Sequence, residues 1–185
     1  DAVVFEDFSS PEITDWFTSG PAFQNAITTS NELTAGTTEQ PVSHLWDVGK
    51  LNSGLAGAQW QGFFRSPTFE ISHNSIWYRV KRVGGKPNLG RRHKNGQINL
   101  IVDGFQLIQN PLYGMLSINV PNDGNWHWLR QDVSKFPGHK AYIELGDEDD
   151  GTLVVDEILF TNQRPTADAP ETMQFALAFE ESVIN

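Results

Sequence analysis

The chain has 185 residues, and its 23 Asp and Glu against 13 Lys and Arg give a formal net charge of −10 at pH 7. This length fits one domain, and the acidic balance argues against nucleic acid as a partner, because nucleic-acid-binding surfaces are basic. The sequence has no Cys, which excludes disulfides, thiol catalysis, Cys-based zinc sites and covalently attached haem, so we expect no haem in this domain. No apolar run approaches the roughly 20 residues that span a bilayer, so we expect no membrane span.

Apolar and β-branched residues that recur with a period of two predict β-strands along most of the chain. Turn signals separate them at Asp103-Gly104, Asn122-Asp123-Gly124, Pro137-Gly138 and Asp150-Gly151. Short strands at this spacing predict a sandwich of two antiparallel sheets with negligible helix before Phe160. The clearest expected strands cover residues 75–80, 97–103, 126–133, 141–145 and 152–160.

Three segments have irregular composition. Residues 19–55 predict long surface loops between two or three short strands, and residues 83–95 predict a loop between two strands. The stretch from Arg164 to Pro170 is typical of a linker. We therefore expect a sandwich domain over residues 1–162, followed over 163–185 by a linker and the start of the next segment of a larger parent protein. Because the chain begins at Asp1 without Met, we expect a processed product or a piece of that parent.

Four sequence blocks, in order, resemble a known group of domains. The opening VFEDF of residues 4–8, with Asp15-Trp16, belongs with them. The series is similar to the β-sandwich modules of levanase-type fructan hydrolases, and more similar to the sandwich domain of planctomycete multidomain proteins that carry cytochrome c-like domains. Both resemble galactose-binding-like jelly rolls. The four blocks are residues 62–71 (GFFRSPTFEI), 97–104 (QINLIVDG), 131–144 (QDVSKFPGHKAYIE) and 154–158 (VVDEI).

The resemblance implies an all-β jelly roll in an exported protein, periplasmic or secreted, with a carbohydrate-associated role. Galactose-binding-like sandwiches often bring their first and last strands together and hold a structural calcium there. Hard cations take six to eight oxygen ligands, and the acidic pairs at the two ends of the expected sandwich, Glu6 with Asp7 and Asp156 with Glu157, are the candidates. The alternative is that these are ordinary half-exposed edge positions.

A basic segment stands out in the acidic chain and is not part of the family pattern. It holds six of the thirteen basic residues, namely Lys81, Arg82, Lys86, Arg91, Arg92 and Lys94. Arg binds sulfate or carboxylate through two parallel hydrogen bonds, so this segment predicts contact with an anionic polysaccharide. The alternative is that these cations neutralise acidic turns of the same molecule.

The aromatic residues divide into core and candidate ligand-binding positions. Trp126 and Trp128 are one residue apart, so on a strand they share a face; the pair favours the core, but it also fits a sugar-stacking platform if that face is open. Tyr113, beside Pro111 and Gly114, is the better exposed candidate. The acidic stretch 147–151 does not have the glycine position of a helix–loop–helix calcium site, and a solvated hairpin turn is the simpler interpretation.

These observations support three hypotheses. The first is a non-catalytic carbohydrate-binding module whose partners are a polysaccharide and the other domains of the parent chain. The second is a structural or protein-interaction spacer domain with no sugar ligand. The third and weakest is an enzyme, because no nucleophile elbow, phosphate-binding loop or dinucleotide fingerprint occurs and no carboxylate pair can be assigned to glycoside hydrolysis.

Overall fold

The computed structural model describes residues 2–10, 12–28, 49–85, 97–103 and 116–166. In these ranges the chain forms strands and no helix, which confirms the predicted all-β, two-sheet antiparallel sandwich. No segment of them is a helix long and apolar enough to cross a membrane.

The first sheet has the order β1-β11-β6-β9, and β3 also pairs with β11. Its strands are β1 (Val3–Glu6), β3 (Leu51–Asn52), β6 (Ser75–Gly84), β9 (His127–Asp132) and β11 (Gly151–Phe160). The second sheet has the order β2-β4-β10-β7-β8, and β5 also pairs with β10. Its strands are β2 (Phe17–Ser19), β4 (Gly62–Arg65), β5 (Phe69–Glu70), β7 (Gln97–Val102), β8 (Ser117–Asn119) and β10 (Lys140–Asp147).

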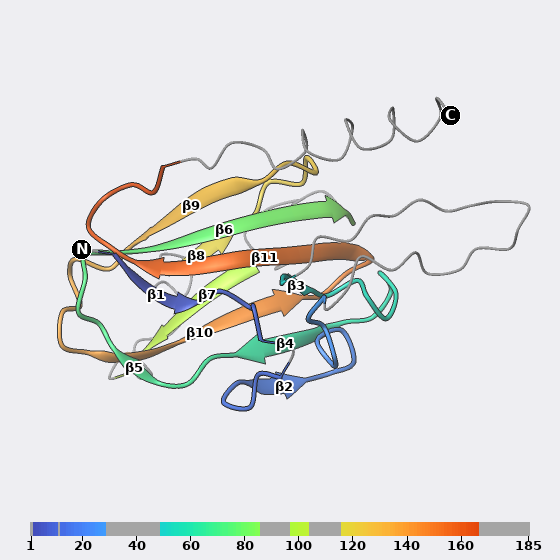
Figure 1. The fold of residues 1–185 in the computed structure, drawn as a ribbon, viewed down its shortest axis with the longest axis horizontal. Helices are drawn as coiled ribbons and strands as arrows, with labels where there is room; N and C mark the ends of the chain where they lie inside the picture. The colour runs from blue at the N-terminus through green and yellow to red at the C-terminus, as the bar shows by residue number, and fades with distance from the viewer. Residues whose placement is uncertain (1, 11, 29–48, 86–96, 104–115, 167–185) are drawn as a thin grey trace, which may run out of the picture.

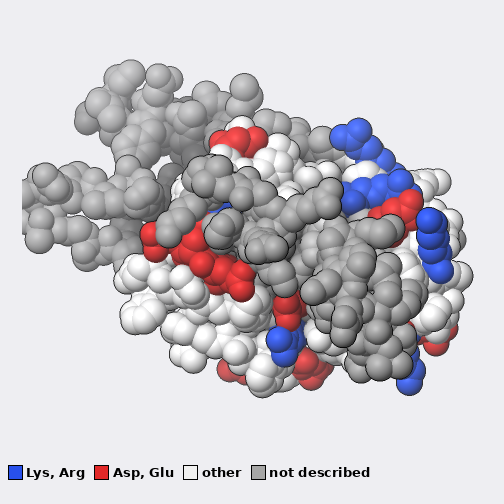
Figure 2. Space-filling view, turned by 180° about the vertical axis from the view of Figure 1, so that it is seen from behind, with Lys and Arg blue, Asp and Glu red and all other residues white. Residues whose placement is uncertain are grey.

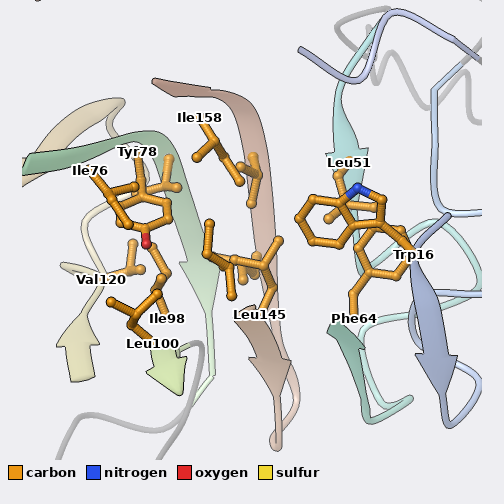
Figure 3. Close-up of a cluster of buried hydrophobic side chains, with 14 of the residues drawn as sticks. Trp16, Leu51, Phe64, Ile76, Tyr78, Ile98, Leu100, Val120, Leu145 and Ile158 are labelled. Carbon is orange, nitrogen blue, oxygen red and sulfur yellow. The ribbon is translucent and has the colours of Figure 1, made fainter. Parts of the chain in front are cut away.

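The core lies between the two sheets and follows from the period of two. Alternate residues of each strand point to one face, and those of the inner faces are fully buried, among them Tyr78, Val80, Ile98, Ile143 and Leu145. Figure 3 shows side chains from both sheets meeting in this layer. Burying one such side chain contributes about 1.5–3 kcal/mol, so each inner-face position of the alternating pattern stabilises the sandwich.

The first and last strands pair, as the family resemblance implied. Val3 lies opposite Phe160 and Val4 opposite Leu159, and the start of β1 and the end of β11 lie on the same side of the molecule in Figure 1. The ring of Phe5 stacks on Phe160 at 4.6 Å between centroids. This contact anchors the first strand to the core.

The loop predicted over residues 83–95 begins later than expected. β6 continues through Gly84, and Val83 pairs with Thr152 of β11. The long partner strand explains the extension. β11 pairs with β6 as far as Gly151 opposite Gly84 and supplies ladder hydrogen bonds at alternate residue pairs.

Candidate functional site

The outer face of the first sheet collects aromatic and basic side chains. Tyr78, Val80 and Arg82 of β6 are buried at 0–1% exposure, so Trp77, Arg79 and Lys81 alternate onto the opposite face. On the neighbouring strand β9, Trp128 lies opposite Arg79 and His127 opposite Val80. This register carries Trp126, just before β9, to the side of Lys81.

Two cations lie over the ring of Trp126. The Arg79 Cζ atom lies 5.5 Å from the centroid of the Trp126 ring, and the Lys81 Nζ atom lies 4.8 Å from it. A cation over an indole is attracted by about 0.5–1 kcal/mol at exposed sites. We call Trp126, Arg79 and Lys81 the Trp126 surface; all three side chains are half-buried and keep part of their surface in water.

The expectation that Trp126 and Trp128 favour the core was wrong. Neither belongs to the hydrophobic cluster between the sheets, nor does Trp77, although Trp77 is only 8% exposed. Their strand alternation was predicted correctly, but the register of β9 on β6 turns them to the outer face. The indole Nε1 atoms of Trp77 and Trp128 are buried there without a hydrogen-bond partner among the described residues.

The charges beside the Trp126 surface are partly compensated. Asp156 accepts from Lys50 at 2.5 Å and from Arg79 at 2.6 Å. At the start of β9, the His127 imidazole lies 2.9 Å from the Asp123 carboxylate. Hydrogen bonds from the Asn125 backbone and from His127 hold the pKa of Asp123 below its ordinary value. The surface therefore has a cationic centre with two carboxylates close by.

Arg82, expected among the surface ligand-binding cations, lies in the interior instead. Its side chain is 1% exposed, and its Nη2 donates to Asp149 Oδ2 at 2.7 Å. The interpretation of residues 147–151 as a solvated acidic turn was also wrong, because Asp147 and Asp149 are 1% and 4% exposed. The two corrections have one cause: the Arg82 guanidinium, near the end of β6, pairs with the buried carboxylate of Asp149 in the β10–β11 turn.

The remaining basic and aromatic candidates lie outside the described residues. These are Lys86, Arg91, Arg92, Lys94 and Tyr113. Where the chain is described, Figure 2 shows a compact group of acidic side chains at one end of the back face, with basic side chains mainly toward the other end.

The four carboxylates expected as calcium ligands have partners close to them in the structure. Glu6 accepts from the Asp7 and Phe8 backbone N–H groups at 3.1 and 2.9 Å and from Trp16 Nε1 at 3.2 Å. Hydrogen bonds from Ser9 hold the pKa of Asp7 below its ordinary value.

Asp156 is occupied by its two cations, and Glu157 lies opposite Arg79. Among the described residues no three His, Asp or Glu side chains gather as a metal-binding group. Calcium at these carboxylates stays a prediction of the resemblance, and an ion there would compete with the hydrogen bonds and ion pairs of Glu6, Asp7 and Asp156.

Sequence reasoning did not select Arg79. The signal was present in part, because Arg79 alternates with the buried residues Tyr78 and Val80 on the predicted strand 75–80, and Lys81 follows directly after that strand. Alternation alone places both cations on one face. The partner Trp126 emerges only from the pairing of β9 with β6.

Comparison with protein-family models gives no match, and comparison with curated proteins gives none either. Among solved structures, the chain is similar to a glycoside hydrolase family 43 arabinoxylan arabinofuranohydrolase from Bacillus subtilis in complex with cellotetraose, at 16% identity over 57% of this chain and 22% of that chain, with a TM-score of 0.36. It is also similar to a family two carbohydrate esterase from Cellvibrio japonicus, at 12% identity over 84% of this chain and 37% of that chain, with a TM-score of 0.37.

The chain is also similar to the catalytic domain of a GH87 α-1,3-glucanase in complex with tetrasaccharides. The identity is 12% over 92% of this chain and 29% of that chain, with a TM-score of 0.36. The chain spans between 22% and 37% of the length of these three carbohydrate-active proteins. At these TM-scores the assignment of the sandwich rests on the strand pairing of this chain itself.

Proposed function

We propose that this domain binds an anionic polysaccharide at the Trp126 surface and catalyses no reaction on it. The observation that carries the proposal is the position of Arg79 and Lys81 beside one indole ring, at 5.5 and 4.8 Å. The C–H face of a sugar packs on an aromatic ring, while a guanidinium and an ammonium bind carboxylate or sulfate groups. An acidic sugar placed against Trp126 reaches both cations. Because polysaccharides of this kind lie outside the cytoplasm, we propose that the domain acts there.

The proposal requires a local field that outweighs the charge of the chain. The net charge of −10 repels a polyanion at long range, but the Debye length is about 10 Å at 0.1 M salt and about 3 Å at 1 M. At moderate salt the distant carboxylates are therefore screened, and binding depends on Arg79 and Lys81 together with the neighbouring Asp156 and Asp123. High salt weakens the cations as well, so binding falls between 0.1 and 1 M.

Dextran sulfate and dextran test the proposal, since they share a backbone and differ only in sulfate groups. In titration calorimetry at 0.1 M salt, Lys81→Ala and Trp126→Ala are expected to weaken binding of dextran sulfate at least tenfold. Lys135→Ala and Trp60→Ala are the matched controls, because both side chains are exposed and neither belongs to the Trp126 surface. Equal binding of dextran, or full binding by both surface variants, contradicts the proposal.

A further inference from the structure

The segment between β3 and β4 carries the chain from the first sheet to the second and presents an exposed indole. Trp60 is 45% exposed and lies just before β4, which begins at Gly62. The orientation of its ring is fixed, because the Nε1 atom donates to the Ala56 carbonyl oxygen at 3.1 Å. Trp60 is therefore held in place while a large part of its ring remains in water.

Two consecutive β-turns make this segment rigid. The Gly57 N–H donates to the Gly54 carbonyl at 3.0 Å, and the Trp60 N–H donates to the Gly57 carbonyl at 3.1 Å. Hydrogen bonds with this spacing close β-turns. Before them, the Gly54 N–H donates to Asn52 Oδ1 at 2.9 Å. Because the segment is already ordered, little entropy is lost when a ligand binds to it.

Two glutamine residues flank Trp60 in the sequence. Gln59 and Gln61 are exposed, and among the described residues neither side-chain amide has a hydrogen-bond partner. The Gln59 amide lies against Gly57, since a Cβ atom on Gly57 would be 2.7 Å from Gln59 Oε1. It therefore stands beside the peptide group whose carbonyl holds the indole. An amide side chain has two donors and one acceptor, so it can bond to a sugar hydroxyl in either sense.

The two segments that meet at Trp60 are uncharged, although about a quarter of the residues in globular domains are charged. Residues 16–28 and 51–64 contain no Lys, Arg, Asp, Glu or His. They lie side by side, because a Cβ atom on Gly20 would be 2.5 Å from the Gln61 carbonyl oxygen and the Ala22 N–H donates to the same oxygen at 3.3 Å. Figure 1 shows the end of β2 and the start of β4 at the same end of the second sheet. These segments give no preference for a charged ligand.

We propose that Trp60, Gln59 and Gln61, the Trp60 surface, form a second ligand site that binds a neutral β-linked glucan of the cellulose type. In such a chain every ring substituent is equatorial, so the sugar rings present flat C–H faces that pack on an exposed indole. The two amides bond to hydroxyl groups at the edge of the sugar ring. Dextran is joined by axial α linkages and does not form such a flat chain. The site does not depend on the function proposed for the Trp126 surface.

Cellopentaose tests this site, and maltopentaose is the linkage control, because both are glucose pentamers and only the first is β-linked. With 15N-labelled protein, millimolar cellopentaose is expected to shift the indole N–H signal of Trp60 and to leave that of Trp126 in place. The Trp60 signal is identified as the one that disappears in Trp60→Phe. Maltopentaose is expected to bind at least about tenfold more weakly, a difference of about 1.4 kcal/mol.

Two variants separate ligand contact from the fold of the segment. Trp60→Ala is expected to weaken cellopentaose binding at least about tenfold. Gln61→Ala, which keeps the bond from Trp60 Nε1 to Ala56, is expected to weaken it about threefold through the loss of one hydrogen bond. Phe17→Ala is the matched aromatic control, because Phe17 is 60% exposed and lies opposite Arg65 at the other end of β2. Gln163→Ala is the amide control, at an exposed position beyond β11.

The two proposals fail independently. Trp60→Ala should keep dextran sulfate, and Trp126→Ala should keep cellopentaose. The Trp60 surface is refuted when millimolar cellopentaose leaves the Trp60 indole signal unchanged, and equally when Trp60→Ala and Gln61→Ala bind cellopentaose as the parent chain does. Equal binding of maltopentaose overturns the assignment to a flat, β-linked chain.

Discussion

Arg82 and Asp149 form an ion pair inside the sandwich, with 2.7 Å between Nη2 and Oδ2 and with 1% and 3% of their side chains exposed. The pair joins the end of β6 to the β10–β11 turn. The space around it is full, because a Cβ atom on Gly85 would lie 2.6 Å from Asp149 Oδ2. A buried pair of this kind holds two chain segments in one register, and losing one partner leaves an unpaired charge in the interior.

Replacing Arg82 with Met is therefore expected to lower the free energy of unfolding by about 3–5 kcal/mol, measured by urea denaturation. Lys135→Met is the control: its side chain is exposed, and surface substitutions of this kind change stability by about 0.5 kcal/mol or less. The double variant Arg82→Met with Asp149→Leu is expected to recover part of the loss. A single variant as stable as the parent chain would show that the pair is dispensable.

Asp147 gives the stability a definite dependence on pH. Burial raises the pKa of Asp147 from 3.8 to about 6, against the opposing effect of a hydrogen bond from Ser53. The folded state therefore binds this proton more tightly than the unfolded state. Its stabilising effect is complete below about pH 4 and is lost as the pH rises through about 6, and the difference amounts to about 3 kcal/mol.

Asp147→Asn is expected to remove this component of the pH dependence. Unfolding free energies from pH 4 to 7 should decline less in Asp147→Asn than in the parent chain, by about 3 kcal/mol over the range. Asp150→Asn, an exposed neighbour in the same turn, should follow the parent curve. Parallel curves for Asp147→Asn and the parent chain contradict the assignment.

Two glycines allow the effect of left-handed backbone conformation on stability to be measured apart from the effect of steric crowding. Gly20 has φ +83° and a Cβ there would lie 2.5 Å from the Gln61 carbonyl oxygen, whereas Gly124 has φ +73° and nothing within 4 Å of that position. A left-handed Ala costs about 1–2 kcal/mol at either position, and crowding adds about 1–3 kcal/mol at Gly20. Thermal unfolding should thus show a larger decrease in Tm for Gly20→Ala than for Gly124→Ala. Equal decreases would mean that β2 and β4 separate at little cost.

The sandwich could be predicted because its signals are local. The alternation in residues 75–80, 141–145 and 152–160 specifies an inner and an outer face within a few positions. Arg82 could not be placed in the same way, because its partner Asp149 lies 67 positions later in the chain. A basic residue close to other basic residues suggests a solvated loop until the partner strand is known.

The candidate surfaces depended on register, which one sequence does not specify. The pairing of β9 with β6 decides that Trp126 lies with Arg79 and Lys81 instead of in the core. Three separate strand pairings are likewise needed to place Arg65, Glu144, Asn99 and Ser117 side by side. Asn99 alone had a sequence signal, as a polar residue inside an apolar run.

The pairing of β1 with β11 has a mechanical consequence. Because Val3 lies opposite Phe160, whatever is joined to either end of the sandwich leaves from the same place (Figure 1). Cα atoms of facing residues in an antiparallel pair are only about 4.5–5.5 Å apart. Tension applied through these two points pulls directly on the β1–β11 pair and hardly at all on the far end. Domains joined at these two points would therefore not be held apart by the length of the sandwich, which would project from them as a side branch.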